Sequence, residues 1–128
     1  MESYFIINKK MYKNTITDVG KEEMCKRIGS SSSSSPFIYL AIGSGTNPAL
    51  TTDTTLQTEL ARGSSDYEYF TSGFLESRVF EPGQGTGTIN EIGLFNSSSQ
   101  GVMLSRCIVD SYNKTSTKPL LVEWRCYL

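Results

Sequence analysis

The sequence predicts a mainly β protein: an antiparallel β-sandwich with one or two short helices near the N-terminal half, in a single domain over residues 1–128. From residue 37 onward, short segments rich in aromatic and aliphatic residues alternate with glycine-rich turns, as in all-β domains. The 128 residues are 38% hydrophobic and include six Phe, seven Tyr and one Trp, which is enough bulk for one core.

A helix is expected at about residues 18–28, ahead of the strands. Thr17 or Asp18 can cap its first turn, and Gly29 suits the left-handed conformation that ends many helices. The side chains expected to face the core are those of Met24, Cys25 and Ile28. Residues 30–35 are all serine, and a run without apolar side chains predicts a solvated loop.

The strands are expected to begin at residue 37. Residues 37–42 are apolar enough to be buried on both faces, and a glycine-rich loop follows them. A second short helix is expected at about residues 53–61, because Leu56 and Leu60 form an i, i+4 apolar pair and Gly63 can end the helix.

The remaining segments are expected to be strands. Residues 67–71 and 74–81 predict a hairpin that turns at Ser72 and Gly73. Two further strands are expected at residues 88–95 and 103–109.

The last segment alternates strictly between apolar and polar residues. The residues expected on its inner face are Leu120, Val122, Trp124, Cys126 and Leu128. Glu123 and Arg125 share the outer face. Because a one-residue slip in register would expose Trp124, we expect this side chain to anchor the core between the sheets, near Phe80 or Phe95.

Composition excludes several function classes. The chain has no histidine, which excludes Ser-His-Asp and Cys-His nucleophile systems and histidine-containing zinc sites. Its three cysteines have no CxxC spacing, so neither a disulfide framework nor a metal site is expected, and a reducing compartment fits better. The two glycine-rich loops lack the pattern of a phosphate-binding loop. We therefore expect no cofactor.

Charge and hydropathy exclude two kinds of partner. The net charge of −1 offers no basic footprint for nucleic acid. The longest apolar run, residues 37–42, is far shorter than the roughly 20 residues of a membrane helix. The first residues lack the basic segment of a secretory signal, so neither membrane insertion nor secretion is expected.

Carboxylates inside apolar patterns are the remaining candidates for chemistry. Glu59 and Glu91 both occur in such patterns, and Arg62 and Arg106 lie beside apolar positions. A buried carboxylate is stabilised by a guanidinium, so Glu91 is expected to form a structural ion pair with Arg106, or alternatively with Arg62. A pair of carboxylates for glycoside hydrolysis is the rival interpretation. We expect no residue of this chain to be catalytic.

An aromatic surface is expected near the hairpin. Tyr67, Tyr69 and Phe74 supply more bulk than a solvent-facing hairpin needs, and they are candidates for a protein interface, for sugar binding or for ordinary core packing.

Several segments carry a resemblance to structural proteins of tailed phages. They are residues 37–46 (FIYLAIGSGT), 54–56 (TTL), 59–62 (ELAR), 89–96 (INEIGLFN), 104–106 (LSR) and the closing tryptophan-bearing strand after residues 113–115 (NKT). Together with residues 16–20 (ITDVG), they resemble in order the N-terminal domain of phage tail-collar fibre proteins and small virion proteins of the same type.

The resemblance implies a non-enzymatic structural protein of a tailed-phage virion, made in the cytoplasm of the host bacterium. The fibre proteins continue into a shaft and a receptor-binding tip, which this sequence does not contain. We therefore expect a module that docks on the particle surface beside other virion proteins, first of all as a capsid decoration or cement protein. A tail, neck or baseplate adaptor for fibre attachment is the alternative, and a carbohydrate-binding adhesin is a further one. The resemblance also implies a homo-oligomer, preferably a trimer.

Overall fold

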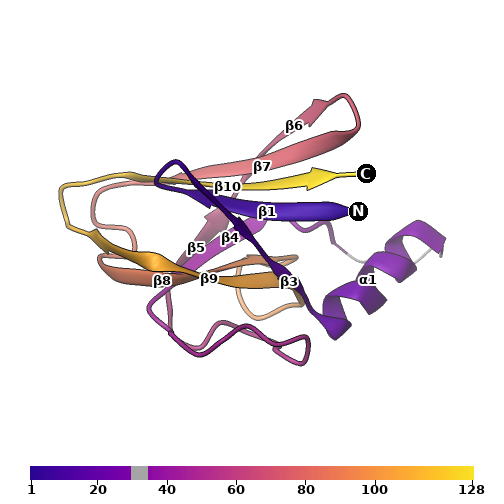
Figure 1. The fold of residues 1–128 in the computed structure, drawn as a ribbon, viewed down its shortest axis with the longest axis horizontal. Helices are drawn as coiled ribbons and strands as arrows, with labels where there is room; N and C mark the ends of the chain where they lie inside the picture. The colour runs from indigo at the N-terminus through magenta and orange to yellow at the C-terminus, as the bar shows by residue number, and fades with distance from the viewer. Residues whose placement is uncertain (30–34) are drawn as a thin grey trace.

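The computed structural model describes residues 1–29 and 35–128, and it shows two antiparallel sheets and one helix (Figure 1). Sheet A has the strand order β2-β1-β10-β7-β6, and sheet B has the order β3-β9-β8-β4-β5. Every strand pairing is antiparallel. The expected mainly β fold with two antiparallel sheets is confirmed.

The elements are distributed between the sheets as follows. Sheet A contains β1 (Glu2–Ile7), β2 (Lys10–Lys13), β6 (Asp66–Phe70), β7 (Gly73–Phe80) and β10 (Leu120–Tyr127). Sheet B contains β3 (Thr15–Ile16), β4 (Tyr39–Gly43), β5 (Glu59–Ser64), β8 (Gly87–Phe95) and β9 (Met103–Lys114). The helix is α1 (Asp18–Gly29).

The first residues are strands, which the sequence interpretation missed when it placed all strands after residue 37. β1 pairs with both β2 and β10 and so lies inside sheet A. The β1–β2 hairpin turns at Asn8 and Lys9, whose φ angles are 50° and 63°. Two successive positive φ angles are typical of the turn that matches the twist of a hairpin.

The helix begins where it was expected. Thr17 caps it: its Oγ1 accepts a hydrogen bond from the Gly20 N–H at 2.9 Å and donates one to the Met103 carbonyl at 2.5 Å. A Cβ at Gly20 would lie 2.6 Å from the Leu104 Cα, so only glycine allows α1 to approach β9 this closely. The cap therefore fixes the helix to sheet B.

The far end of the helix differs from the expectation. Gly29 was expected to follow the helix in a left-handed conformation. It is instead the last residue of the helix, and its φ angle is not left-handed. Met24 packs against the core, but Cys25 is exposed and Ile28 is 85% exposed. Most of the predicted serine loop, residues 30–34, lies outside the described residues, and Ser35 is exposed.

Replacing Thr17 with alanine is expected to lower the free energy of unfolding by about 1–2 kcal/mol, because a fully buried cap and its bond to β9 disappear together. Urea denaturation measures this change. Thr17→Ser keeps the hydroxyl and serves as the control. Equal losses for both variants would show that the methyl group, rather than the cap, stabilises this position.

The second predicted helix, residues 53–61, does not form. Residues 44–58 contain no helix or strand, and β5 begins at Glu59. Leu56 is buried while Leu60 is 37% exposed, so the i, i+4 pair is not an apolar helix face. The other expected strands are present, and the 67–71 and 74–81 hairpin appears as β6 and β7, with Ser72 at a φ of 71°.

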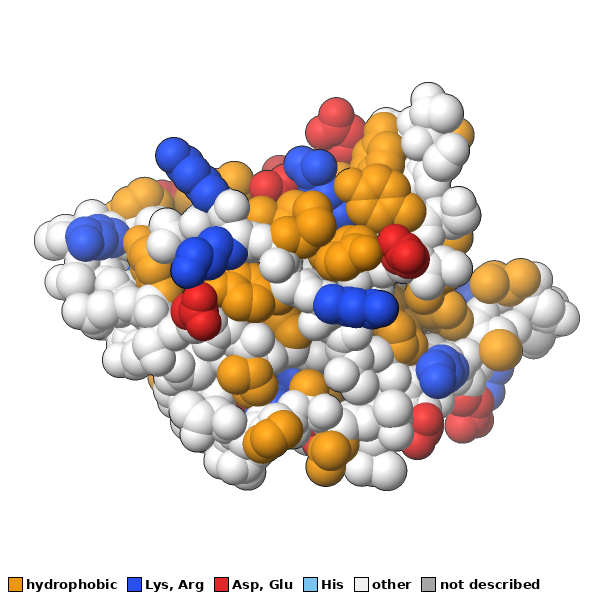
Figure 2. All heavy atoms as spheres, viewed as in Figure 1, with side chains coloured by type: hydrophobic (Ala, Val, Ile, Leu, Met, Phe, Trp, Pro, Cys, Tyr) orange, Lys and Arg blue, Asp and Glu red, His pale blue; other side chains and the backbone are white. Residues whose placement is uncertain are grey.

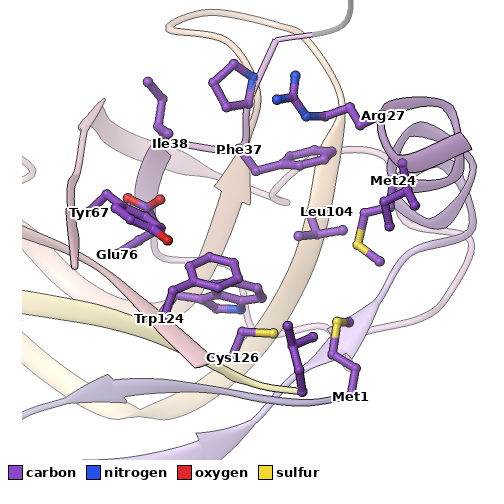
Figure 3. A pocket seen from close by; sticks show the side chains of 14 residues that line it. Met1, Met24, Arg27, Phe37, Ile38, Tyr67, Glu76, Leu104, Trp124 and Cys126 are labelled. Atoms are coloured by element: carbon purple, nitrogen blue, oxygen red, sulfur yellow. The ribbon is translucent and has the colours of Figure 1, made fainter. Parts of the chain in front are cut away.

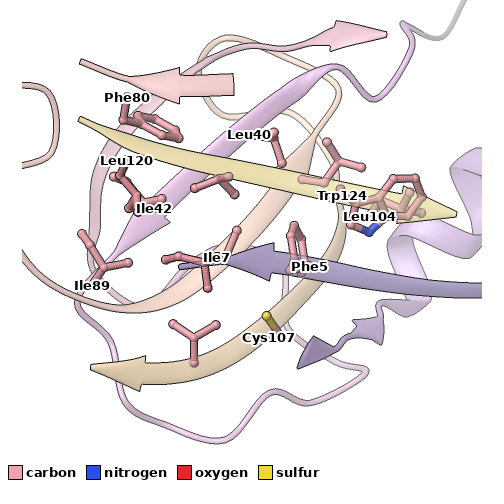
Figure 4. Close-up of a cluster of buried hydrophobic side chains, with 14 of the residues drawn as sticks. Phe5, Ile7, Leu40, Ile42, Phe80, Ile89, Leu104, Cys107, Leu120 and Trp124 are labelled. Carbon is pink, nitrogen blue, oxygen red and sulfur yellow. The ribbon is translucent and has the colours of Figure 1, made fainter. Parts of the chain in front are cut away.

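Two apolar clusters stabilise the sandwich. The larger lies between the sheets and includes Phe5, Phe80 and Trp124 (Figure 4). The smaller consists of Ala41, Leu56, Phe95 and Met103. In the register of β4 and β8, Ala41 and Phe95 alternate with the inward-facing Leu40 and Leu94, so the smaller cluster lies on the outer face of sheet B.

Candidate functional site

A buried ion pair lies on the outer face of sheet B. The Arg106 Nε donates to the Glu91 Oε2 at 2.9 Å, and the two residues are 1% and 0% exposed. Glu91 is on β8 and Arg106 on the neighbouring β9. The structure thus pairs Glu91 with the first of its two predicted partners.

The Glu91 carboxylate also binds the backbone of the loop between β4 and β5. Its Oε1 accepts hydrogen bonds from the N–H groups of Gly45 at 3.0 Å and Thr58 at 2.7 Å, and its Oε2 accepts one from Gln57 at 2.9 Å. A Cβ at Gly45 would lie 2.6 Å from the Glu91 Oε1, so this close approach requires glycine. Both carboxylate oxygens are therefore engaged by the protein's own groups.

Arg106 holds the middle of the same loop. Its Nη1 donates to the Asp53 Oδ2 at 2.9 Å and to the Pro48 carbonyl at 3.3 Å, and its Nη2 donates to the Asn47 carbonyl at 3.0 Å. The pair thereby attaches residues 44–58 to sheet B and covers the smaller apolar cluster. The sequence interpretation missed Asp53 as a member of this network, because it placed residues 53–61 in a helix.

Arg62, the alternative partner, belongs to a second cluster. Its Nη2 donates to the Glu59 Oε1 at 2.6 Å, and its guanidinium lies 3.5 Å from the centroid of the Phe95 ring. It also donates to the carbonyls of Ser97 and Gln100 in the turn that follows β8. Arg62 therefore stabilises that turn and does not reach Glu91.

Trp124 is buried, as expected, but its neighbours differ from the prediction. It is 1% exposed, and its nearest aromatic contact is Phe74, with ring centroids 5.6 Å apart. Phe95 lies in the other cluster, and Phe80 lies in the same cluster but near the opposite end of β10, opposite Leu120 (Figure 4). The indole Nε1 is buried without a hydrogen-bond partner among the described residues.

A groove of about 490 Å³ opens at the end of the sandwich, between the inner face of sheet A and α1 (Figure 3). Its lining is almost entirely apolar: Trp124, Phe74 and Cys126 from sheet A face Phe37, Leu104 and Met24. A volume of this size is ordinary for a ligand pocket, roughly 300–1,000 Å³. No feature of the sequence predicted this groove.

Glu76 is the acidic residue of the groove lining. It is 3% exposed and accepts a hydrogen bond from the Ser65 hydroxyl at 2.5 Å, and no ion pair reaches it among the described residues. Burial raises the pKa of Glu76, the Ser65 bond lowers it, and the charge of Asp66 raises it further. Glu76 lies on the inner face of β7 between Phe74 and Phe80. An acidic residue at an inward position of a predicted strand could have identified it from the sequence, but the sequence interpretation did not consider it.

Replacing Glu76 with glutamine is expected to stabilise the protein at neutral pH. Because the folded-state pKa lies above the ordinary value of 4.5, the folded state favours the protonated carboxyl, and its stability falls as the pH rises past that value. The melting temperature of Glu76→Gln should exceed that of the wild type at neutral pH and approach it below about pH 4. A pH-independent difference would contradict this interpretation.

Two tyrosines of the predicted interface are exposed. Tyr67 is 61% and Tyr69 71% exposed, whereas Phe74 is half-buried against Trp124. The Tyr67 and Phe74 ring centroids are 5.6 Å apart. β6 is an edge strand of sheet A, and Tyr67 lines the groove at its open rim.

The cysteines divide by burial. Cys107 and Cys126 are buried, which raises the pKa of both thiols, and Cys25 is exposed. Across residues 1–29 and 35–128, no cluster of three or more acidic, cysteine or histidine side chains is arranged to hold a metal ion. No helix in the same ranges is long and apolar enough to cross a membrane.

Comparison with known proteins returned no relative: no family model, no curated protein and no solved structure matches this chain.

Proposed function

We propose that this protein is a structural component of a tailed-phage virion that docks on the particle surface as a small β-sandwich, first of all as a capsid decoration or cement protein. A tail, neck or baseplate adaptor for fibre attachment is the alternative location. The proposal places the protein in the virion after synthesis in the host cytoplasm, as a homotrimer beside other virion proteins, with no catalytic role.

One observation carries this proposal. Most of the segments that resemble phage structural proteins meet on sheet B and its covering loop: residues 37–46, 54–56, 59–62, 89–96 and 104–106. Glu91 and Arg106 come from two of these segments, and they bind Gly45 in a third. The segments that carry the resemblance therefore pack together on one sheet. This is expected if they represent the conserved structural core of a domain type rather than unrelated short matches.

The surface of sheet A supports a docking role. Tyr4, Phe70 and Tyr127 form an aromatic cluster on the face opposite the core, with ring centroids of Tyr4 and Phe70 at 6.3 and 5.6 Å from that of Tyr127. Figure 2 shows hydrophobic side chains gathered over β1, β7 and β10. Contiguous apolar surface of this kind is typical of protein interaction sites.

The test is to purify particles of the phage that encodes the chain and to locate the protein on them. Many copies on a symmetric capsid lattice are expected, because a lattice lets weak contacts act together. Copies confined to the tail or neck would select the adaptor role. Intact particles that lack the protein would overturn the proposal. Light scattering of the free 14.2 kDa chain tests the trimer separately.

A carbohydrate-binding adhesin is the second candidate, favoured by the exposed tyrosines. Tyr67 and Tyr69 present aromatic rings on one face of β6, and such rings can stack on sugars. Binding to a glycan array that is lost in the Tyr67→Ala, Tyr69→Ala double variant would support this function over particle docking.

A further inference from the structure

We propose that the groove at the open end of the sandwich binds an extended segment of a partner protein, which pairs with the edge of β6 and places a lysine or arginine, flanked by apolar residues, against Glu76. The inference specifies the chemistry of one partner contact and rests on the proposed docking function. Four features of the groove lead to it.

The first feature is apolar surface of the inner face that remains open. Tyr67 and Tyr69 pair with Glu76 and Phe74, so they lie on the core side of sheet A. They nevertheless remain largely exposed, because the β6–β7 hairpin extends past sheet B (Figure 1). Across the groove stand Phe37 and α1. The occupant must therefore present apolar side chains.

The second feature is an acidic group that forms no ion pair among the described residues, in a groove that Arg27 of α1 also lines. Glu76 is almost fully buried, and the one hydrogen bond that it receives from the described residues comes from Ser65. The charge of Asp66 on the adjacent β6 also acts on Glu76. A buried carboxylate gains most from a charged donor, so the complementary side chain is lysine or arginine.

The third feature is an unused donor. The Nε1 of Trp124 has no hydrogen-bond partner in residues 1–29 and 35–128, and Trp124 is part of the groove floor (Figure 3). A buried polar group without a hydrogen bond costs roughly 1–3 kcal/mol. An occupant with a carbonyl oxygen, such as a peptide backbone, can accept this bond.

The fourth feature is the free edge of β6. Among the described residues, β6 pairs only with β7, and alternate residues of an edge strand turn their N–H and C=O groups outward. An added strand would lie about 10 Å from β7, two strand spacings away. A lysine side chain and the Glu76 carboxylate can bridge that gap together. Main-chain pairing would supply affinity, and the groove would supply specificity.

The experiment uses a displayed library of random short peptides, selected against the full chain, with the enriched sequences then synthesised. Trp124 is the chain's single tryptophan, so its fluorescence reports occupation of the groove directly. Binding is measured with the wild type and Glu76→Gln. Glu81→Gln, an exposed acid after β7, is the matched control. Thermal unfolding verifies that each variant is folded.

We expect enrichment of peptides with a basic residue between apolar ones and a change in Trp124 fluorescence on binding. Affinity should be at least about tenfold weaker for Glu76→Gln and unchanged for Glu81→Gln. Because Glu76→Gln should stabilise the free protein, weaker binding by a more stable variant cannot come from damage to the fold. Absence of enrichment, enrichment without basic residues, or equal binding by Glu76→Gln would overturn the inference.

Particle association separates this inference from the proposed function. If the wild type binds these peptides but is absent from particles, the virion role fails and the groove assignment stands. If the wild type and Glu76→Gln join particles equally and no peptide is enriched, the groove assignment fails and the virion role stands.

Discussion

Replacing Trp124 with alanine is expected to lower the free energy of unfolding by about 3–5 kcal/mol, a large part of the roughly 5–15 kcal/mol available to a small domain. The indole is 1% exposed, packs on Phe74 and belongs to the cluster between the sheets. Alanine would leave a cavity beside the open groove. Urea denaturation measures the loss, and an unfolding midpoint equal to that of the wild type would show that this side chain does not anchor the core.

Trp124→Phe is the informative companion variant. Phenylalanine keeps an aromatic contact with Phe74, and it removes an N–H that is buried without a hydrogen-bond partner in the part of the chain that the structure describes. Phenylalanine is smaller than tryptophan, so the change still removes buried volume, but it removes much less than alanine does, and loss of the unsatisfied donor offsets part of the cost. The loss of stability should therefore be clearly smaller than that of Trp124→Ala. A Phe variant as unstable as the Ala variant would mean that the indole N–H has a partner in solution.

The sequence was most informative where one face of a strand is buried and the other is not. β10 has this pattern: Val122, Trp124 and Cys126 are buried, and Glu123 and Arg125 lie on the other face with their charged groups 3.7 Å apart. Period-two alternation determines the register independently of distant residues. The sandwich and the burial of Trp124 were therefore predictable.

The errors arose where distant groups decide the local structure. Residues 53–61 have an apolar i, i+4 pair, yet the Glu91 carboxylate takes the N–H groups of Gln57 and Thr58, and these are then unavailable to a helix. β1 and β2 were missed for a different reason. Their turn at Asn8 and Lys9 lacks the glycine that usually marks such a hairpin.

The groove could not be predicted, because it depends on where one sheet ends relative to the other. Local patterns place Glu76 and Tyr67 on strands, but they do not show that the β6–β7 hairpin extends past sheet B. By contrast, the pairing of Glu91 with Arg106 follows from charged residues at buried positions of adjacent strands. Its prediction did not require knowledge of the loop of residues 44–58 that the pair holds.

Replacing Glu91 with glutamine is expected to cost about 3–5 kcal/mol of stability, because it removes the fully buried one of the two carboxylates that pair with Arg106 and leaves the partly exposed Asp53. An amide also cannot accept all four hydrogen bonds that the two carboxylate oxygens now receive from Arg106, Gly45, Gln57 and Thr58. Loss of these bonds frees the loop of residues 44–58. Limited proteolysis should therefore cleave this loop faster in the variant, and incorporation into particles should fall in parallel with stability.

Glu59→Gln is the matched control, since it breaks another Glu–Arg pair of the same sheet. The Glu59 side chain is 33% exposed, so its pair with Arg62 should contribute less than about 1 kcal/mol. The difference in the free energy of unfolding between Glu91→Gln and Glu59→Gln measures how much more the buried pair of Glu91 and Arg106 contributes to stability than a partly exposed pair does. If Glu91→Gln folded with wild-type stability and lost a measurable hydrolytic activity instead, both the structural role of the pair and the non-enzymatic function would be wrong.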